Sequence, residues 1–564
     1  MKFGHIAPAL ALAVATSPAL AERGGDGDLR VLYWQAPTVL NPYISTGAKD
    51  VDPASMVIEP LALVADDGSL ISVLAAEIPS LENGGIAQDY MSVTWKLKPG
   101  LVWSDGTPVT AEDVKFTAAY CMHPEFGCSV LSEFAGIASV EALDAQTVRL
   151  NFDAPRYAPL QAFVGGRTPI LQQAQFAACL GPAGVSCTAQ NFGPIGTGPY
   201  RVTDFKSGDV AQFEINPNYR DPAKPAFDRV IVKGGGDAMA AARAVLESAE
   251  YDFAWNLQLP PESVAAMEAK GKGRVVASFG SMVERIDLNQ SDASPNLPEG
   301  LRSTLANPHP FLTDPAVRRA LSMAIDRQII AELAYGPAGR ATCTILPVPA
   351  AVAPTGPCAA QDIAGARALL DQAGWVPGAD GIRQKNGVRL SMLFQTSVNA
   401  VRQDEQALVK QWWQEIGVET ELKAVEPSSF FGSDPGNPDT RQKFYADAEM
   451  YTDAYYLPDP ASFLNEFTCA RIPSPDTQWQ GKNTPRFCDA AYDETVRQLH
   501  QSITPAVRQQ LSRELDARLT ADGNYTLPLI HRGMVSAHVH TLNGVLPNGW
   551  EGQLWNVADW SRAK

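Results

Sequence analysis

Alternating and helical apolar patterns follow one another along the chain. Val93, Trp95 and Leu97 alternate with polar residues, as a half-buried strand requires. Pro-Gly and Asp-Gly dipeptides then supply turns. Thr110 and Asp113 have the spacing of a capping box, which predicts that a helix begins there. This stretch therefore predicts strand, turn, strand, turn and helix in close succession.

The second half shows the same mixture of elements. Asp314 and Asp362 each precede a helical stripe of apolar residues, so we expect each to cap a helix. A third helix is predicted over residues 401–416, with Trp412 packed in the core. An alternating strand is predicted over residues 418–425. Helices and strands thus alternate along the chain, which predicts an α/β protein.

Several of these segments also resemble one known family. Residues 95–114 (WKLKPGLVWSDGTPVTAEDV) closely resemble the signature of solute-binding protein family 5, the extracytoplasmic receptors of peptide-type ABC importers. Further segments resemble the family's recurring sequences in the expected order: 196–202 (GTGPYRV), 311–320 (FLTDPAVRRA), 366–375 (ARALLDQAGW) and 459–464 (DPASFL). The resemblance covers nearly the whole chain after residue 21.

The resemblance implies a two-lobed α/β fold of the periplasmic-binding-protein (Venus flytrap) kind, with an extra subdomain in the first lobe. A ligand between the lobes contacts both only when the hinge closes, so binding shifts an open–closed equilibrium without covalent chemistry or a cofactor. Mapped onto this chain, the predicted boundaries are lobe I at 29–282 and 529–564, its extra subdomain at 67–195, lobe II at 283–528, and hinge strands near 284–289 and 526–531.

The first residues predict export. Lys2 precedes an apolar run over residues 6–14, and Ala-Leu-Ala at 19–21 has the pattern of a cleavage site. Because that run is too short to cross a bilayer, residues 1–21 are expected to be a cleaved signal peptide. With no cysteine directly after the cleavage site, we expect a soluble protein of a Gram-negative periplasm. The net charge of −17 argues against nucleic acid and anionic membranes as partners.

The eight cysteines form couples that are close in sequence. Eight cysteines allow 105 pairings, but this clustering and the predicted exported location favour local disulfides. The spacing of a zinc site is absent from the sequence. The expected pairs are Cys121 with Cys128, Cys179 with Cys187, Cys343 with Cys358, and Cys469 with Cys488.

Strand ends supply the first-lobe candidates for ligand contact. Open α/β sheets bind ligands beyond the carboxyl ends of their strands. Trp34 and Trp255 are the candidates for stacking on a ligand, with core packing as the alternative. The full first-lobe set comprises Tyr33, Trp34 and Gln35 after one strand, Trp255 and Asn256 after a second, and Ser281 after a third.

The second lobe supplies candidates just before the Asp-Pro motif. In peptide-binding members of the family, an acidic side chain there pairs with the ligand α-amine. Counting back from this motif reaches Tyr456 instead of an acid, and Asp453 replaces that acid only if the loop is longer. Tyr451, Tyr455 and Tyr456 are too dense for one buried face, so at least one is expected to line the cleft. The alternatives are a capped turn for Asp453 and a packing cluster for the tyrosines. Arg285, near the hinge, is expected to meet a local acid.

The sequence therefore predicts a monomeric receptor that captures peptides or a related small solute and delivers it to an inner-membrane ABC permease. Oligosaccharides, opines, haem and metal chelates remain alternative ligands. A secreted hydrolase is the rival class, but no G-x-S-x-G or H-E-x-x-H motif is present. His538 and His540 could share one strand face as metal ligands, but an exposed strand face is the favoured interpretation, because no third ligand is evident nearby. A structural module would show repeats, and none stands out.

Overall fold

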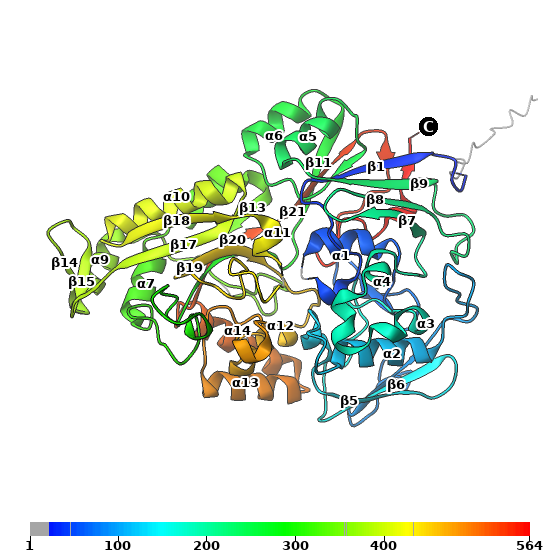
Figure 1. Ribbon diagram of the computed structural model, residues 1–564, viewed down its shortest axis with the longest axis horizontal. Coiled ribbons are helices and arrows are strands. Elements are labelled where there is room, and N and C mark those ends of the chain that lie inside the picture. Colours follow the sequence, from blue (N-terminus) through cyan, green and yellow to red (C-terminus); the bar gives the residue numbers. More distant parts are fainter. Residues whose placement is uncertain (1–21, 46, 355, 357, 433, 564) are drawn as a thin grey trace, which may run out of the picture.

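The computed structural model describes residues 22–45, 47–354, 356, 358–432 and 434–563. The predicted signal peptide, at residues 1–21, lies outside the described residues. Two large mixed sheets stand apart within the molecule, each with helices on its faces (Figure 1). Across the described ranges, every helix is too short or too polar to cross a membrane.

The first large sheet is mostly built from the N-terminal half of the chain. Its central strand β1 (Asp28–Tyr33) runs parallel to both neighbours, while β21 (Met534–Val539) returns from the C-terminal end and pairs antiparallel. Helices α1 (Ala48–Ser55), α5 (Ala238–Leu246) and α6 (Pro261–Glu268) accompany it. The strand order is β11 (Gly273–Ser278), β21, β10 (Phe253–Ala254), β1, β9 (Arg229–Gly234), β8 (Val210–Ile215) and β7 (Tyr200–Lys206).

The second large sheet is built from the C-terminal half. All six residues of β12 (Val283–Leu288) are buried, since the strand lies inside the sheet between β20 and β19. The order is β13 (Gly339–Ala341), β20 (Thr526–Arg532), β12, β19 (Ala448–Asp453), β17 (Ser391–Ser397) and β18 (Glu419–Val425). Its helices include α7 (Pro315–Met323), α8 (Arg327–Ile330), α9 (Ile363–Gln372), α10 (Ala400–Glu415) and α11 (Pro427–Phe430).

A smaller unit contains the segment with which the sequence analysis began. Strands β4 (Ser92–Lys96), β6 (Thr147–Phe152) and β5 (Ile137–Ala142) form an antiparallel sheet beside α2 (Ala111–Met122). The predicted capping box is confirmed, because Asp113 Oδ2 accepts from the Thr110 N–H at 2.9 Å. Short helices α3 (Gln173–Phe176) and α4 (Thr188–Phe192) complete this unit, and β2 (Ala62–Val64) pairs with β3 (Leu70–Ser72).

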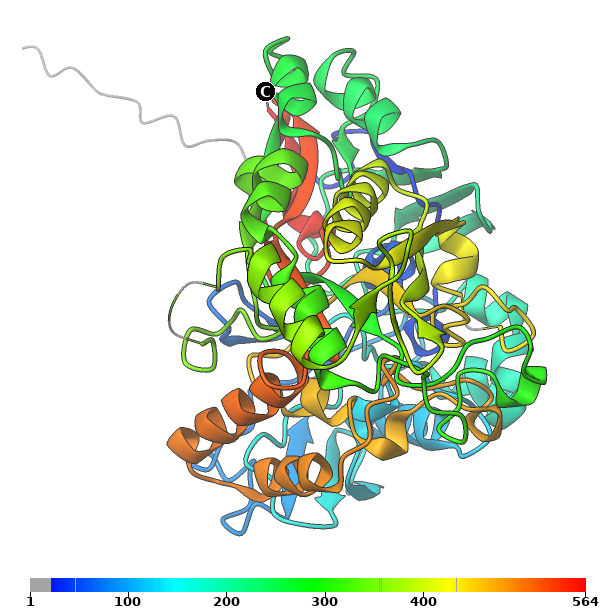
Figure 2. The same cartoon turned by 90° about the vertical axis from the view of Figure 1, so that its left-hand side faces the viewer.

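Three helices fill the space between the second sheet and the small unit. They are α12 (Ala461–Asn465), α13 (Ala490–Gln501) and α14 (Pro505–Leu519), which lie close to α2 and β5 in both views (Figures 1 and 2). Their buried residues Phe463 and Leu515 belong to the same apolar cluster as the core of the first sheet. A separate cluster fills the second sheet and its helices. Packing therefore joins part of the predicted second lobe to the first.

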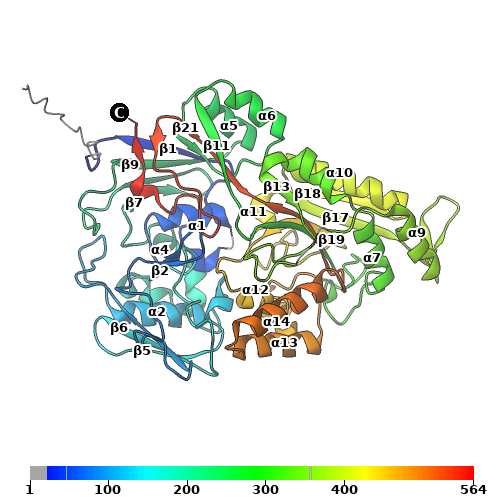
Figure 3. The ribbon, with the colours of Figure 1, turned by 180° about the vertical axis from the view of Figure 1, so that it is seen from behind.

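Strands occur where the hinge was predicted. β12 and β20 pair antiparallel at the positions expected for the two hinge strands. After β20 the chain passes through Gly533 into β21, so one continuous segment runs from the second sheet to the first (Figure 3). The lobe and subdomain boundaries themselves stay predictions.

The helix caps of the second half are confirmed. Asp314 accepts from the Ala316 N–H at 2.9 Å, and Asp362 accepts from the Gly365 N–H at 2.7 Å. Trp412 is buried in the core of the second sheet, as predicted. Strand β10 ends at Ala254, so Trp255 and Asn256 follow it, and Asn256 adopts a left-handed backbone conformation with φ 51°.

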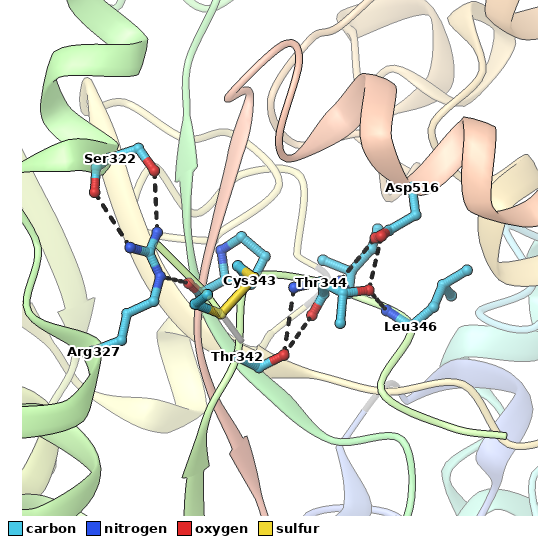
Figure 4. Close-up of a disulfide and its surroundings, with 10 residues drawn as sticks. Ser322, Arg327, Thr342, Cys343, Thr344, Leu346 and Asp516 are labelled. Atoms are coloured by element: carbon cyan, nitrogen blue, oxygen red, sulfur yellow. Dashed lines mark hydrogen bonds between the residues drawn. A yellow bond between two sulfur atoms is a disulfide. The ribbon is translucent and has the colours of Figure 1, made fainter. Parts of the chain in front are cut away.

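The four predicted disulfides are present: Cys121–Cys128, Cys179–Cys187, Cys343–Cys358 and Cys469–Cys488. Figure 4 shows the surroundings of Cys343. Next to it, Thr344 donates to Asp516 of α14 at 2.8 Å, and the Ile345 N–H donates to the same carboxylate at 3.0 Å. The disulfide therefore closes a loop that is also anchored to helix α14.

Small hairpins complete the described elements. β14 (Val376–Pro377), β15 (Arg383–Lys385) and β16 (Val388–Arg389) form one antiparallel sheet, and β22 (Leu542–Asn543) pairs with β23 (Ser561–Arg562).

Candidate functional site

A cavity of about 500 Å³ lies between the two large sheets and takes its walls from both halves of the chain. Residues of α1 and of the segments that follow β10 and β22 form one wall. Residues at the end of β19 and in the loop after α11 form the opposite wall. A ligand held there touches both halves at once, which is the arrangement that couples binding to closure.

Asp52 of α1 is the central carboxylate of the first wall. Its Oδ2 accepts from the Tyr33 hydroxyl at 3.2 Å, the Trp255 indole at 3.0 Å and the Gln553 N–H at 3.1 Å. Burial raises the pKa of Asp52 to about 6, although these hydrogen bonds act in the opposite direction. The Tyr33 ring stacks on Trp255 with centroids 4.8 Å apart, so one face of the indole is already covered.

Glu551 is a second carboxylate on the same wall. Its two oxygens accept from the N–H groups of Val64 at 2.8 Å and Gly166 at 3.0 Å. Burial raises the pKa of Glu551 to about 7, and the nearby charge of Asp52 adds to that shift. Both carboxyl groups thus face the cavity with a weakened tendency to ionise.

Thr452 lies at the centre of the second wall, between two arginines. Arg402 of α10 donates to Glu284 at 2.7 Å and to the Thr452 hydroxyl at 3.1 Å. Arg532, at the end of β20, donates to Thr452 at 3.0 Å and across the cavity to Asn256 Oδ1 at 2.7 Å. Arg532 therefore joins the two walls through hydrogen bonds that exist only when the walls are close.

Asp453 lines the cavity beside a buried arginine. Arg285 donates to Asp453 at 3.0 Å and to the Tyr451 hydroxyl at 3.1 Å, and it also lies 3.2 Å from Asp287. Burial raises the pKa of Asp453, but the charges of Arg285, Arg441 and Lys482 outweigh burial and hold the pKa below its usual range. The prediction that Arg285 meets a local acid is confirmed.

The structure brings some of the predicted ligand contacts to the cavity and keeps others beneath its walls. Gln35, Trp255, Asn256, Asp453 and Tyr456 line the cavity. Their contact with a ligand stays a prediction.

The other predicted contacts support the walls in this structure. Tyr33 lies under Trp255, and the Trp34 indole donates to the Asn256 carbonyl at 2.9 Å. The Tyr455 N–H donates to the Ser281 hydroxyl at 2.9 Å, and the Tyr455 hydroxyl donates to the Val348 carbonyl. Tyr451 is fully buried and its hydroxyl donates to Asp287 at 2.8 Å.

The two histidines that were considered as metal ligands, His538 and His540, have other surroundings. His538 is buried, and its Nε2 accepts from Arg274 at 3.1 Å while His540 is exposed. Throughout the described ranges, His, Cys, Asp and Glu side chains do not gather in threes as they would around a metal ion.

Several cavity residues carried no signal in the sequence. Asp52, Glu551, Arg167 and Arg441 lie far apart in the chain and follow no motif, so only the folded structure brings them together. The single available hint was the position of Asp52 in a short helix that follows the first strand.

Three comparisons with known proteins agree with this geometry. Residues 73–473 match the family model described as "Bacterial extracellular solute-binding proteins, family 5 Middle". Protein XP55 of Streptomyces lividans is 28% identical over 519 residues, which cover 92% of this chain and 84% of that protein. A putative ABC transporter peptide-binding protein of Brucella ovis is 29% identical over 366 residues, 61% of this chain and 63% of that protein.

The fold is shared with solved structures. The oligopeptide-binding protein AppA of Bacillus subtilis, in complex with a nonapeptide, aligns with a TM-score of 0.79 at 22% identity. The alignment covers 96% of this chain and 100% of that one. At this identity the match shows the common two-lobed α/β fold.

Proposed function

Since the chain belongs to the family 5 bacterial extracellular solute-binding proteins, we propose that it is the periplasmic receptor of an ABC importer, capturing a peptide or a related small solute between two lobes. The observation that carries the proposal is the cavity of about 500 Å³ with walls from both large sheets. A volume of this size suits a drug-sized or short-peptide ligand. The Brucella relative named as a peptide-binding protein supports the peptide class.

Closure of the two halves is the proposed working step. Arg532 donates to Thr452 on one wall and to Asn256 on the other, so these hydrogen bonds stabilise the closed arrangement. Ser281 and Tyr455 form a second contact of this kind, through the Tyr455 N–H. A ligand that touches both walls adds its own contacts to this set and shifts the equilibrium toward closure. The importer then recognises the closed shape, and no bond of the ligand is made or broken.

Delivery to an inner-membrane permease, export through residues 1–21 and a monomeric state belong to the same proposal. They follow from the family and from the predicted signal peptide rather than from any contact within the described residues.

Binding without turnover is the experiment that tests the proposal. Purified protein is mixed with a pool of di- to pentapeptides, and its unfolding temperature and tryptophan fluorescence are measured. We expect ligand-dependent stabilisation, a fluorescence change because Trp255 lines the cavity, and recovery of the bound peptides unaltered by mass spectrometry. Cleaved peptides would favour the hydrolase alternative. If no pool stabilises the protein and no ligand remains bound to protein purified from the host, the receptor proposal is contradicted.

A further inference from the structure

One carboxyl group lies where the two predicted lobes meet and has a buried oxygen that no donor binds. Glu133 belongs to the short 3-10 helix Leu131–Phe134 of the predicted extra subdomain, and it lines the cavity. Its Oε2 atom is buried and has no hydrogen-bond partner among the described residues. Such a group is costly in its charged form, because the carboxylate loses its hydration and gains nothing in exchange.

The other side of this contact carries a second carboxyl group, that of Glu466. It directly follows helix α12, in the predicted second lobe, and is 4% exposed. Ser132, the chain neighbour of Glu133, donates to Glu466 Oε1 at 2.9 Å and so joins the two segments. Two acids from different predicted lobes are therefore brought close together away from bulk water, where like charges repel more strongly than in solution.

The cations near Glu133 are Lys482 and Arg167, and both are engaged elsewhere. Lys482 donates to Glu466 at 2.6 Å, through the same Oε1 that accepts from Ser132. The Arg167 guanidinium lies over the Tyr456 ring, 4.4 Å from its centre. Lys482 thus balances the charge of Glu466, and the contact accommodates one carboxylate better than two.

The surroundings of Glu133 favour its neutral form. Burial first, and then the charge of Glu466, raise the pKa of Glu133 to about 7. The charges of Lys482 and Arg167 and the side chain of Ser462 act in the opposite direction without cancelling that shift. The pKa therefore agrees with the unpartnered oxygen and with the position of the two acids.

We propose that Glu133 takes up a proton from solvent when the lobes close, so that closure, and ligand capture with it, is favoured in acidic surroundings. This inference rests on the proposed receptor function and adds a regulation to the same movement. With the lobes apart, both acids face water and ionise in their ordinary range. In the closed state Glu133 is neutral, and Glu466 keeps its charge beside Lys482.

The direction of the effect follows from the two states of Glu133. Its pKa is about 7 in the closed state and has the ordinary value of 4.5 when water surrounds the group. The contribution of Glu133 to closure is therefore full below pH 4.5 and is lost as the pH rises to about 7.

Other groups titrate in the same range and must be separated from Glu133. Burial also raises the pKa values of Asp52, to about 6, and Glu551, to about 7. His500 acts in the opposite direction, because burial, and then the charge of Arg156, lower its pKa to about 4. A comparison of variants at each pH isolates the part that Glu133 contributes.

The test measures the apparent affinity for a pool of di- to pentapeptides by tryptophan fluorescence, at about pH 5.5 and about pH 8. Glu133→Gln has nearly the same shape as the protonated side chain and stays neutral at both pH values. Glu466→Gln removes the neighbouring charge and leaves Lys482 free to pair with an ionised Glu133. Glu82→Gln is the matched control, because Glu82 is exposed in the same predicted subdomain and lies outside the cavity lining.

We expect the affinity of the wild type, divided by that of Glu133→Gln, to fall about tenfold between the lower and the higher pH. At the higher pH, Glu133→Gln should bind more tightly than the wild type, a gain that a merely structural role of Glu133 does not produce. Glu466→Gln should also lessen the pH dependence, and Glu82→Gln should behave as the wild type.

The same pH dependence in the wild type and Glu133→Gln, or weaker binding by Glu133→Gln at the higher pH, would overturn the inference and leave the receptor function standing. If Glu133→Gln does not fold, Glu466→Gln decides, and a pH dependence equal to that of the wild type overturns the inference. If neither the peptide pool nor a ligand carried from the host binds any of these proteins at either pH, the receptor function is rejected and this inference with it.

Discussion

The buried Arg285 and the partly exposed Asp453 form an ion pair at the edge of the cavity, with Nη2 and Oδ2 3.0 Å apart. Arg285 is also bonded to Tyr451 and lies against Asp287, so its charge is balanced from two sides. The main role of the Asp453 carboxylate is thus to balance the charge of Arg285. Any role in ligand recognition would be shared with this arginine.

Replacing Asp453 should therefore lower stability. Asp453→Asn leaves the buried Arg285 with less compensation, which we expect to reduce the free energy of unfolding by about 3 kcal/mol. Urea unfolding measures this difference. The control is Glu77→Gln, which removes the exposed ion pair with Lys96 and should change stability by less than about 0.5 kcal/mol. Equal effects of the two substitutions would show that Arg285 does not need Asp453.

Asn256→Gly should weaken ligand binding without weakening the fold. The substitution removes the oxygen that accepts from Arg532 across the cavity, and glycine tolerates the left-handed backbone at this position, φ 51°. We expect affinity to fall by about tenfold, because a hydrogen bond to a charged group is lost from the closed state. Fluorescence titration measures the affinity.

Asn386→Gly provides the matched control for that substitution. Asn386 has φ 52° in the turn between β15 and β16, away from the cavity. Its replacement should leave affinity unchanged, and a comparable loss there would show that the effect of Asn256→Gly comes from the backbone.

Asp52 should make stability depend on pH. Its folded-state pKa is about 6 and its ordinary value is 3.8, so the folded state keeps a proton that the unfolded state releases between these values. The free energy of unfolding contributed by Asp52 is therefore full below pH 3.8 and falls as the pH rises to about 6. The surrounding groups are Tyr33, Trp255, Gln553 and Glu551.

Asp52→Asn should flatten that part of the pH profile. Chemical unfolding of both proteins at several pH values measures their free energies of unfolding. That of the wild type should fall relative to that of Asp52→Asn between pH 4 and 6. Above pH 7 the difference between the two proteins should stay constant, apart from the contribution of Glu551. Parallel profiles of the two proteins would place the Asp52 pKa near its ordinary value.

The disulfides should contribute strongly to stability. Cys343 and Cys358 close a loop with a sequence separation of 15, and the double substitution to serine is expected to lower the free energy of unfolding by about 3 kcal/mol. Because all eight cysteines are paired, none should react with iodoacetamide before reduction. With a reductant present, the wild type and the variant should unfold alike. A persistent difference would mean that the serines act through packing.

Local order in the chain was predictable where short-range chemistry decides it. The capping box of Thr110 and Asp113, the caps at Asp314 and Asp362, and the disulfides each depend on residues that are close in sequence. The fold and its family could be recognised because the matching segments occur in the expected order along the chain.

The cavity was harder to predict because tertiary packing decides which side chains reach it. Tyr451, Tyr455 and Tyr456 look alike in sequence, yet only Tyr456 lines the cavity, since Tyr451 lies inside the sheet and Tyr455 bonds to the Val348 carbonyl. Arg167 and Arg441 follow no sequence motif, and only the folded chain brings them to the cavity.

Small-angle X-ray scattering of the purified protein, with and without the ligand that it carries from its host, tests the central claim most directly. If two halves close on a solute at the strands β12 and β20, the radius of gyration should decrease on ligand addition, and the ligand should be recovered chemically unchanged. Identical scattering curves at saturating ligand, or a ligand altered by the protein, would contradict the account.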